Sequence, residues 1–153
     1  EALCLSTHIA HSKSVAVTFI QASFLALPIV SRQMDYLFLS GIMYSSVPGR
    51  QARQAWLRSL SSRLKAGGIA MVSFLIDRTG KSGSPRLAYQ LSAWLAGLPG
   101  ANNAYQLGDV FSSGHFLHAF LTEEELRSEM TETGATIVQL NWDRQFVVLT
   151  WPR

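Results

Sequence analysis

The feature that most constrains the fold is a strand, helix and strand pattern between residues 34 and 77. Residues 34–42 (MDYLFLSGI) form a nearly continuous apolar run, which is typical of a strand covered on both faces. Residues 50–68 have helical periodicity, and residues 69–77 (IAMVSFLID) form a second apolar run. Two buried strands joined by a helix through short connections predict the βαβ unit of a parallel sheet.

The helix predicted within this unit is amphipathic. Its apolar stripe is expected to consist of Ala52, Ala55, Trp56, Leu60 and Leu64. The arginines lie on the opposite face, which we interpret as solvated. Gly67 and Gly68 are expected to cap the helix, because glycine adopts positive φ at little cost.

Further elements are predicted before and after this unit. Residues 2–11 predict a short helix, and residues 15–20 (VAVTFI) predict a third buried strand, followed by a loop that ends at Pro28. Residues 86–98 predict an amphipathic helix. Residues 102–114 are polar and contain glycine, so we expect a loop there.

The last third of the chain carries the sharpest local pattern. Thr122 with Glu125 three residues later is typical of a capping box, which predicts a helix that stops at Gly134. Residues 135–142 and 145–151 are rich in β-branched side chains and are separated by a short polar turn. They predict an antiparallel hairpin that closes the sheet.

Composition limits the class of protein. With 153 residues, 48% of them hydrophobic, the chain suits one domain over residues 1–153. The net charge of +3 comes from separate Arg and Lys residues, so a nucleic-acid partner is not expected. Cys4 is the only cysteine, which excludes an internal disulfide and favours the reduced cytoplasm. No apolar stretch reaches the roughly 20 residues of a membrane-spanning helix, so a soluble protein without a membrane partner is expected.

The order of these segments resembles the C-terminal part of the class I S-adenosylmethionine-dependent methyltransferases. FLALP (24–28), MDYLFLSGIMYSSVP (34–48) and the run LKAGG followed by IAMVSFL (64–75) are similar to consecutive family segments. GHFLHAFLTEEELRSEMTETGATIV (114–138) is similar to the family's penultimate helix and strand. The resemblance covers nearly the whole chain, but the family's glycine-rich first turn and its ribose-binding acidic residue are not found in it.

The resemblance implies a fold and an activity. The fold is an α/β, Rossmann-like methyltransferase sheet, mostly parallel, with a C-terminal antiparallel hairpin and without the family's N-terminal strands. The activity is transfer of a methyl group from S-adenosyl-L-methionine to a small-molecule acceptor. Because the N-terminal motif is not found, an incomplete domain with weak or absent cofactor binding as an isolated chain is expected.

Four residues are implied as cofactor contacts by the resemblance: Ser23, Phe24, Ser40 and Gly41. Ser23 stands where the family commonly has an Asp that accepts a hydrogen bond from the adenine amino group. A serine hydroxyl also accepts this bond, but more weakly because it carries no charge. Phe24 either presses against adenine or is a core aromatic, and Gly41 either allows close approach of the cofactor or only serves a turn.

The rule for open α/β sheets places ligands beyond the carboxyl ends of the strands. This rule selects the ends near Ser23, Ser40 and Asp77 and predicts that the three share one crevice.

Three residues are candidates for catalysis: Tyr44, His115 and His118. Methyl transfer from a sulfonium mainly needs alignment and exclusion of water, so no catalytic triad is expected. Each histidine either orients or deprotonates a substrate or packs against neighbouring phenylalanines. Tyr44 either faces the substrate or is a packing aromatic. A metal site is not expected, because Asp109 is the nearest acid before the two histidines and no further Cys or His follows them.

Two alternative functions stay open. One is a catalytically inactive methyltransferase-like module that binds another subunit, which the serine at position 23 favours. The other is an RNA or protein methyltransferase, because the fold alone does not fix the substrate; the sparse basic pattern argues against RNA. Exposed sheet edges also predict self-association.

Overall fold

The structure is a computed structural model that describes residues 6, 10–18, 20–23, 28–77, 108–112 and 115–152. For residues 110–112, 115 and 116 it describes the backbone only. The helix predicted at 86–98 and most of the helix predicted at 2–11 lie outside the described residues; residues 10–12 are helical.

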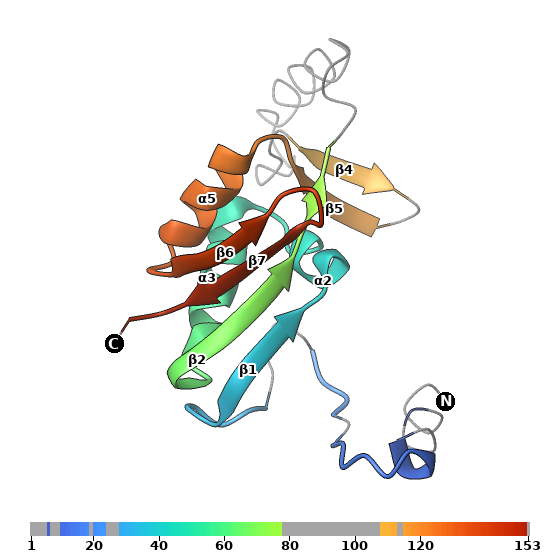
Figure 1. Ribbon diagram of the computed structural model, residues 1–153. Coiled ribbons are helices and arrows are strands. Elements are labelled where there is room, and N and C mark those ends of the chain that lie inside the picture. Colours follow the sequence, from blue (N-terminus) through green and yellow to red (C-terminus); the bar gives the residue numbers. More distant parts are fainter. Residues whose placement is uncertain are drawn as a thin grey trace.

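A four-stranded mixed sheet forms the centre of the molecule (Figure 1). Its strands are β1 (Met34–Leu39), β2 (Leu64–Ser73), β6 (Thr136–Asn141) and β7 (Phe146–Thr150), in the order β1-β2-β7-β6. β1 and β2 are parallel, whereas β7 is antiparallel to both β2 and β6. The predicted C-terminal hairpin is present, and the architecture is α/β and Rossmann-like. The prediction of a mostly parallel sheet is wrong for the described strands, because β7 is antiparallel to both of its neighbours.

A smaller sheet lies beyond the end of β2 (Figure 1). It contains β3 (Leu75–Ile76), β5 (His115–Phe120) and β4 (Asp109–Ser112), with β5 parallel to β3 and antiparallel to β4. The loop predicted over residues 102–114 is therefore wrong at 109–112. β4 is four residues long and has a polar residue at each end, so it carries too short a pattern to be recognised in the sequence.

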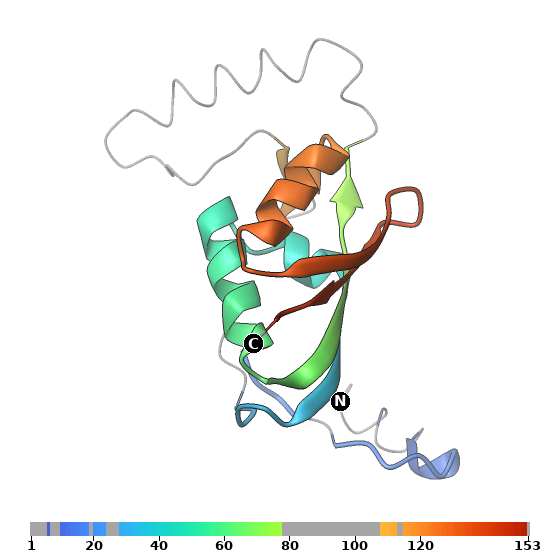
Figure 2. The same cartoon turned by 60° about the vertical axis from the view of Figure 1, so that its left-hand side comes forward.

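Three described helices pack on one side of the central sheet (Figure 2). They are α2 (Gly41–Ser45), α3 (Arg50–Ser61) and α5 (Glu123–Thr131). Their buried side chains meet those of β2 and β7 in one hydrophobic core, which includes Leu57, Leu60, Val72, Leu126, Met130 and Leu149. In the described part of the chain, no helix is long and apolar enough to cross a membrane.

The predicted capping box of α5 is confirmed. The Thr122 hydroxyl accepts a hydrogen bond from the backbone N–H of Glu125 at 3.1 Å. In return, Oε2 of Glu125 accepts from the backbone N–H of Leu121 at 3.1 Å, one residue before the capping position. Three glutamates in the first turn also suit the positive end of the helix dipole. The helix therefore has a fixed start, and this fixes the position of the Glu125 side chain.

The βαβ unit is present, but α3 is shorter and rotated relative to the prediction. It ends at Ser61, and Gly67 (φ +75°) lies within β2, beside an irregularity in the pairing with β1. The glycines therefore do not cap the helix. Ala52 and Ala55 are exposed, whereas Arg53 is fully buried. The interpretation of all arginines as a solvated face is thus wrong for Arg53, because a buried acid pairs with it.

The strand predicted at residues 15–20 is not formed. Residues 15–18 and 20 are exposed and belong to no strand. A strand needs a neighbour for its backbone hydrogen bonds. Within the described residues, β1 pairs only with β2, and no segment pairs with residues 15–18. Ser23 therefore does not follow a strand end, and the predicted meeting of three strand ends is reduced to the two ends of β1 and β2.

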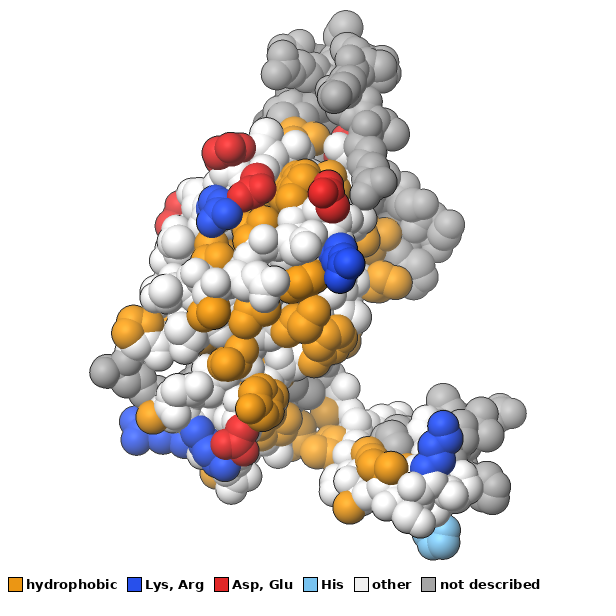
Figure 3. Space-filling view, in the orientation of Figure 1, with side chains coloured by type: hydrophobic (Ala, Val, Ile, Leu, Met, Phe, Trp, Pro, Cys, Tyr) orange, Lys and Arg blue, Asp and Glu red, His pale blue; other side chains and the backbone are white. Residues whose placement is uncertain are grey.

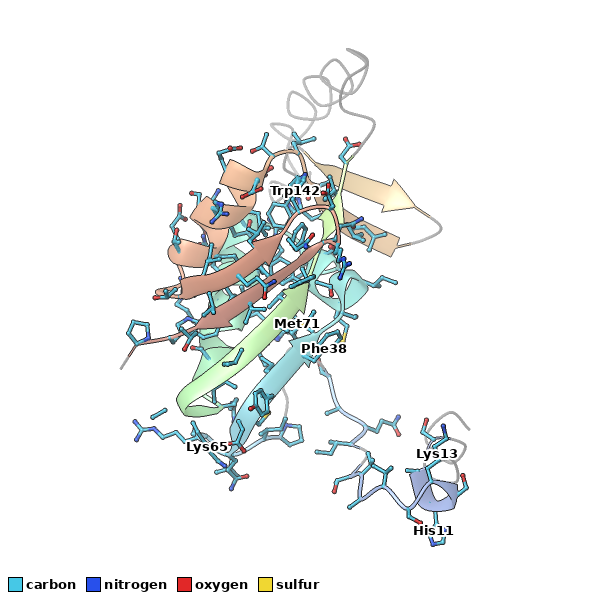
Figure 4. All side chains as sticks on the ribbon, viewed as in Figure 1. His11, Lys13, Phe38, Lys65, Met71 and Trp142 are labelled. Atoms are coloured by element: carbon cyan, nitrogen blue, oxygen red, sulfur yellow. The ribbon has the colours of Figure 1, made fainter. Side chains whose placement is uncertain are left out.

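One face of β1 is uncovered in the described part of the chain, contrary to the prediction of a strand buried on both faces. Tyr36 and Phe38 are 78% and 66% exposed. Figure 4 shows Phe38 beside Met71, its register partner on β2, on the side of the sheet away from the helices. Figure 3 shows hydrophobic side chains gathered over this side.

We expect this chain to self-associate through the β1 edge and its apolar face, because unpaired edges and exposed aromatic side chains favour association. Phe38→Lys should weaken the association by about tenfold or more, since it removes the burial of a large apolar side chain. Light scattering across a concentration series measures the effect. Val15→Lys, the same kind of change at an exposed apolar residue outside the sheet, is the control. A chain that stays monomeric at high concentration contradicts the expectation.

Candidate functional site

The parallel pairing of β1 and β2 brings their carboxyl ends together at one edge of the sheet. Leu39 is paired with Val72, so the residues that follow, Ser40 on one strand and the segment 74–77 on the other, lie at the same edge. The segment continues into β3, and the backbone N–H of Asp77 donates to the carbonyl of Phe120 at 3.0 Å. This edge is the usual ligand position in open α/β sheets.

The implied cofactor residues occupy different places. The Ser40 hydroxyl caps α2 by accepting from the backbone N–H of Met43 at 3.3 Å. Gly41 is the first residue of α2, and a Cβ there would lie 3.4 Å from the backbone nitrogen of Phe74, an ordinary contact distance, so packing at this turn does not by itself require a glycine. Ser23 is exposed and lies in no strand, and Phe24 lies outside the described residues. The structure thus groups Ser40 and Gly41 with the end of β2.

Tyr44 lies in a buried network of charged and aromatic side chains. Its hydroxyl donates to Oε1 of Glu129, and its ring lies nearly parallel to those of Trp56 and Phe120. Nε and Nη2 of Arg53 donate to the two carboxylate oxygens of Glu129, each at 2.8 Å. The side chains of Arg53 and Glu129 are 0% and 1% exposed. This geometry matches the packing alternative for Tyr44, since its hydroxyl is already bonded.

The charges of this network are fixed by burial and by the pair itself. Burial raises the pKa of Tyr44 well above its ordinary value, and the negative charge of Glu129 raises it further. Burial alone would lower the pKa of Arg53, but the hydrogen bond and the charge of Glu129 outweigh it and raise that pKa. Tyr44 is therefore neutral and Arg53 charged at neutral pH.

His118 lies next to this network on β5. Its Nδ1 is 2.7 Å from Oδ1 of Asp109 on β4, and both side chains are buried. Its Nε2 has no hydrogen-bond partner among the described residues, and Oε1 of Glu125 lies 3.8 Å away. The ring meets Phe120 edge to face at 4.8 Å between centroids. Phe120 thus contacts both Tyr44 and His118.

His115 starts the same strand, where its backbone pairs with Ser112; its side chain is not described. Asp109 was not predicted as a site residue, because it lies in a segment expected to be a loop. Glu125 was predicted only as a capping residue. No group of three or more His, Cys, Asp or Glu side chains is placed to hold a metal ion within the described residues.

Solved structures of S-adenosylmethionine-dependent methyltransferases have the same fold at low identity. One from Methanosarcina mazei has a TM-score of 0.59 and 14% identity over 86% of this chain and 66% of that one. One from Clostridium acetobutylicum has a TM-score of 0.62 and 10% identity, over 99% and 71% of the two chains. A complex of DhpI with SAM and HEP has a TM-score of 0.55 and 17% identity, over 95% and 61%.

The described residues have the class I methyltransferase fold. No protein-family model and no curated protein matches the sequence. The chain spans about two thirds of the length of the archaeal structure and about seven tenths of the clostridial one. The resemblance inferred from the sequence is thereby confirmed at the level of the fold.

The described residues fit one wall of an S-adenosylmethionine site. The Ser40–Gly41 turn contacts Phe74 just after β2, and the half-buried Asp77 follows β3 beyond that point. Hydroxyl, carboxylate and backbone groups of this kind suit the amino, hydroxyl and carboxylate groups of such a molecule. The charged groups of Arg53 and Glu129 are not available to bind this cofactor, because Arg53 is bonded to both carboxylate oxygens of Glu129.

Replacing Arg53 with Met should lower the free energy of unfolding by about 3–5 kcal/mol, because it leaves Glu129 as a buried charge without its cation. The matched control is Arg50→Met in the same helix. Arg50 pairs with Glu132 near the surface, and loss of such a pair costs about 1 kcal/mol or less. Urea denaturation followed by circular dichroism measures both. Equal losses of unfolding free energy in the two variants would show that breaking the buried pair costs no more than breaking the surface pair.

The raised pKa of Tyr44 makes a second prediction. Above about pH 10, tyrosine in the unfolded chain loses its proton while Tyr44 in the folded chain keeps it, so stability falls as pH rises. Tyr44→Phe has no phenolic proton to lose at this position, so its stability lacks this dependence on pH. The stability gap between the wild type and this variant should therefore narrow above pH 10, by up to about 1.4 kcal/mol per pH unit. Between pH 6 and 8 the gap should be constant; a constant gap up to pH 11.5 refutes the assignment.

Proposed function

We propose that this chain is part of an S-adenosyl-L-methionine-dependent methyltransferase that acts on a small molecule in the cytoplasm. The observation that carries the proposal is the parallel pair β1 and β2, whose carboxyl ends adjoin the buried His118 and Tyr44 in a fold shared with such enzymes. When bound, the cofactor supplies an electrophilic methyl group on a sulfonium. Ser40 and Gly41, with Ser23 and Phe24 by resemblance, would hold it.

The contribution of the protein to this chemistry is position and exclusion of water. The nucleophile must lie in line with the methyl group, and most of the rate enhancement comes from that alignment. His118 is buried and close to the ligand edge, so it is the catalytic candidate that the geometry favours. His115, at the start of the same strand, stays a candidate by residue type alone. Tyr44 contributes by fixing α2 against α5 through its bond to Glu129.

The alternative is a catalytically inactive module with the same sheet, and one observation favours it. Ser23 is exposed and supplies no charge at the position where the family commonly has a carboxylate. Titration of the natural full-length protein with S-adenosylhomocysteine in a calorimeter separates the two. Heat with micromolar affinity supports the methyltransferase, and no heat supports the inactive module.

A gain-of-affinity substitution tests the adenine contact. Ser23→Asp should tighten the binding of S-adenosylhomocysteine about five- to tenfold, because a charge-assisted hydrogen bond to the adenine amino group is stronger than a neutral one by about 1 kcal/mol. Ser31→Asp adds the same charge at another exposed serine and should leave the affinity unchanged. Calorimetric titration of both variants gives the comparison. Equal affinities of the two variants for S-adenosylhomocysteine would show that Ser23 does not contact the adenine.

A further inference from the structure

The tautomer of His118 is set by Asp109. An ionised carboxylate only accepts hydrogen bonds, so the 2.7 Å contact with Oδ1 of Asp109 requires the hydrogen on Nδ1 of the imidazole. In the neutral ring the other nitrogen, Nε2, then carries a lone pair and no hydrogen. A backbone ladder holds the two side chains in place, since Asp109 on β4 is paired with His118 on β5. Asp109 thus presents Nε2 as an acceptor.

This acceptor is buried and makes no hydrogen bond within the part of the chain that the structure describes. A buried polar atom left without a hydrogen bond costs about 1–3 kcal/mol, and such atoms are rare in folded proteins. The His118 side chain is 1% exposed, but Glu125 beside Nε2 keeps 29% of its side chain exposed. Nε2 is therefore buried, beside a side chain that is partly exposed.

The charges around Nε2 select the group that could pair with it. Asp109 and Glu125 flank the ring, and Oε1 of Glu125 is 3.8 Å from Nε2, too far for a direct hydrogen bond. The nearby cation, Arg53, is bonded to both oxygens of Glu129. Two acceptors side by side suit a neutral O–H or N–H group. A carboxylate or phosphate would be repelled by the two acidic side chains.

We propose that His118 accepts the proton of a neutral hydroxyl or amine as that group is methylated, with Asp109 as a positioning residue; this rests on the function proposed above. A lone pair on the acceptor oxygen or nitrogen forms the bond to the methyl carbon of a sulfonium donor, whose sulfur keeps the pair of the broken carbon–sulfur bond. The O–H or N–H proton of the acceptor moves to Nε2, and the bonding pair that it leaves stays on the acceptor atom. Asp109 and Glu125 then flank the resulting imidazolium.

The first test needs no cofactor. In the natural full-length protein with ¹⁵N-labelled histidine, NMR should show His118 with a hydrogen on Nδ1 and none on Nε2. His118→Gln identifies the resonance by removing it, and His11→Gln, at an exposed histidine in the N-terminal segment, is the matched control. A hydrogen on Nε2 in the wild type overturns the proposal, whether or not the His118 variant folds.

The second test uses three probes of matched size. Phenol and aniline at millimolar concentration should shift the Nε2 resonance, whereas benzoate should not. Asp109→Asn should lower the fraction of the ring with hydrogen on Nδ1 and reduce these shifts. Absence of a shift with phenol and aniline, or an equal shift with benzoate, refutes the proposed acceptor class.

The third test separates this proposal from the proposed function. His118→Gln should lower kcat for methyl transfer to phenol or aniline by about 10²- to 10⁴-fold, with KM and the affinity for S-adenosylhomocysteine within about threefold of the wild type. Suppose that the wild type binds S-adenosylhomocysteine but the variant keeps full kcat, or that neither probe is methylated. Either result refutes the proposed role of His118 and leaves the proposed function standing. If the wild type binds no S-adenosylhomocysteine, the methyltransferase assignment falls.

Discussion

The ion pair between Arg53 and Glu129 is the interaction on which the arrangement of the site depends. It is bidentate, fully buried and joined by the hydroxyl of Tyr44, so it ties α3, α5 and α2 together at one point. A buried pair of this kind adds little net stability compared with a well-packed apolar core, but removing one partner leaves a costly charge. It therefore acts as a constraint, because the helices can pack only in a register that keeps both charges satisfied.

This constraint extends to the ligand edge through Phe120. Its ring lies parallel to Tyr44, under the Arg53 guanidinium at 5.9 Å, and edge-on to both Phe74 and His118. The side chain thus connects the buried network to the end of β2 and to the imidazole. A shift of α3 or α5 would disturb the contacts of Phe120 and, through them, the His118 ring. The position of His118 is in this sense a consequence of helix packing.

Periodicity and capping predicted the local elements well, and pairing between distant segments was where prediction failed. The capping box at Thr122 and the final hairpin depend on neighbouring residues, so the sequence alone specified them. Residues 15–20 have strand-forming side chains, but strand formation also needs a paired neighbour, which no local pattern reveals. The burial of Arg53 could not be predicted for the same reason. Its burial depends on Glu129, 76 residues further along the chain.

The candidate site also depends on contacts between segments that are distant in the sequence, and the structure reveals these contacts. From the sequence, each of Tyr44, His115 and His118 is open to both a catalytic and a packing role. The structure distinguishes Tyr44 from His118 by their partners. The Tyr44 hydroxyl donates to Glu129, whereas His118 has Nδ1 beside Asp109 and an Nε2 without a hydrogen-bond partner among the described residues. Only the pairing of β4 with β5 places Asp109 opposite His118, and β4 was predicted to be a loop. A polar group that is buried, oriented and unsatisfied is more informative about function than its residue type, because folding alone does not account for leaving it so.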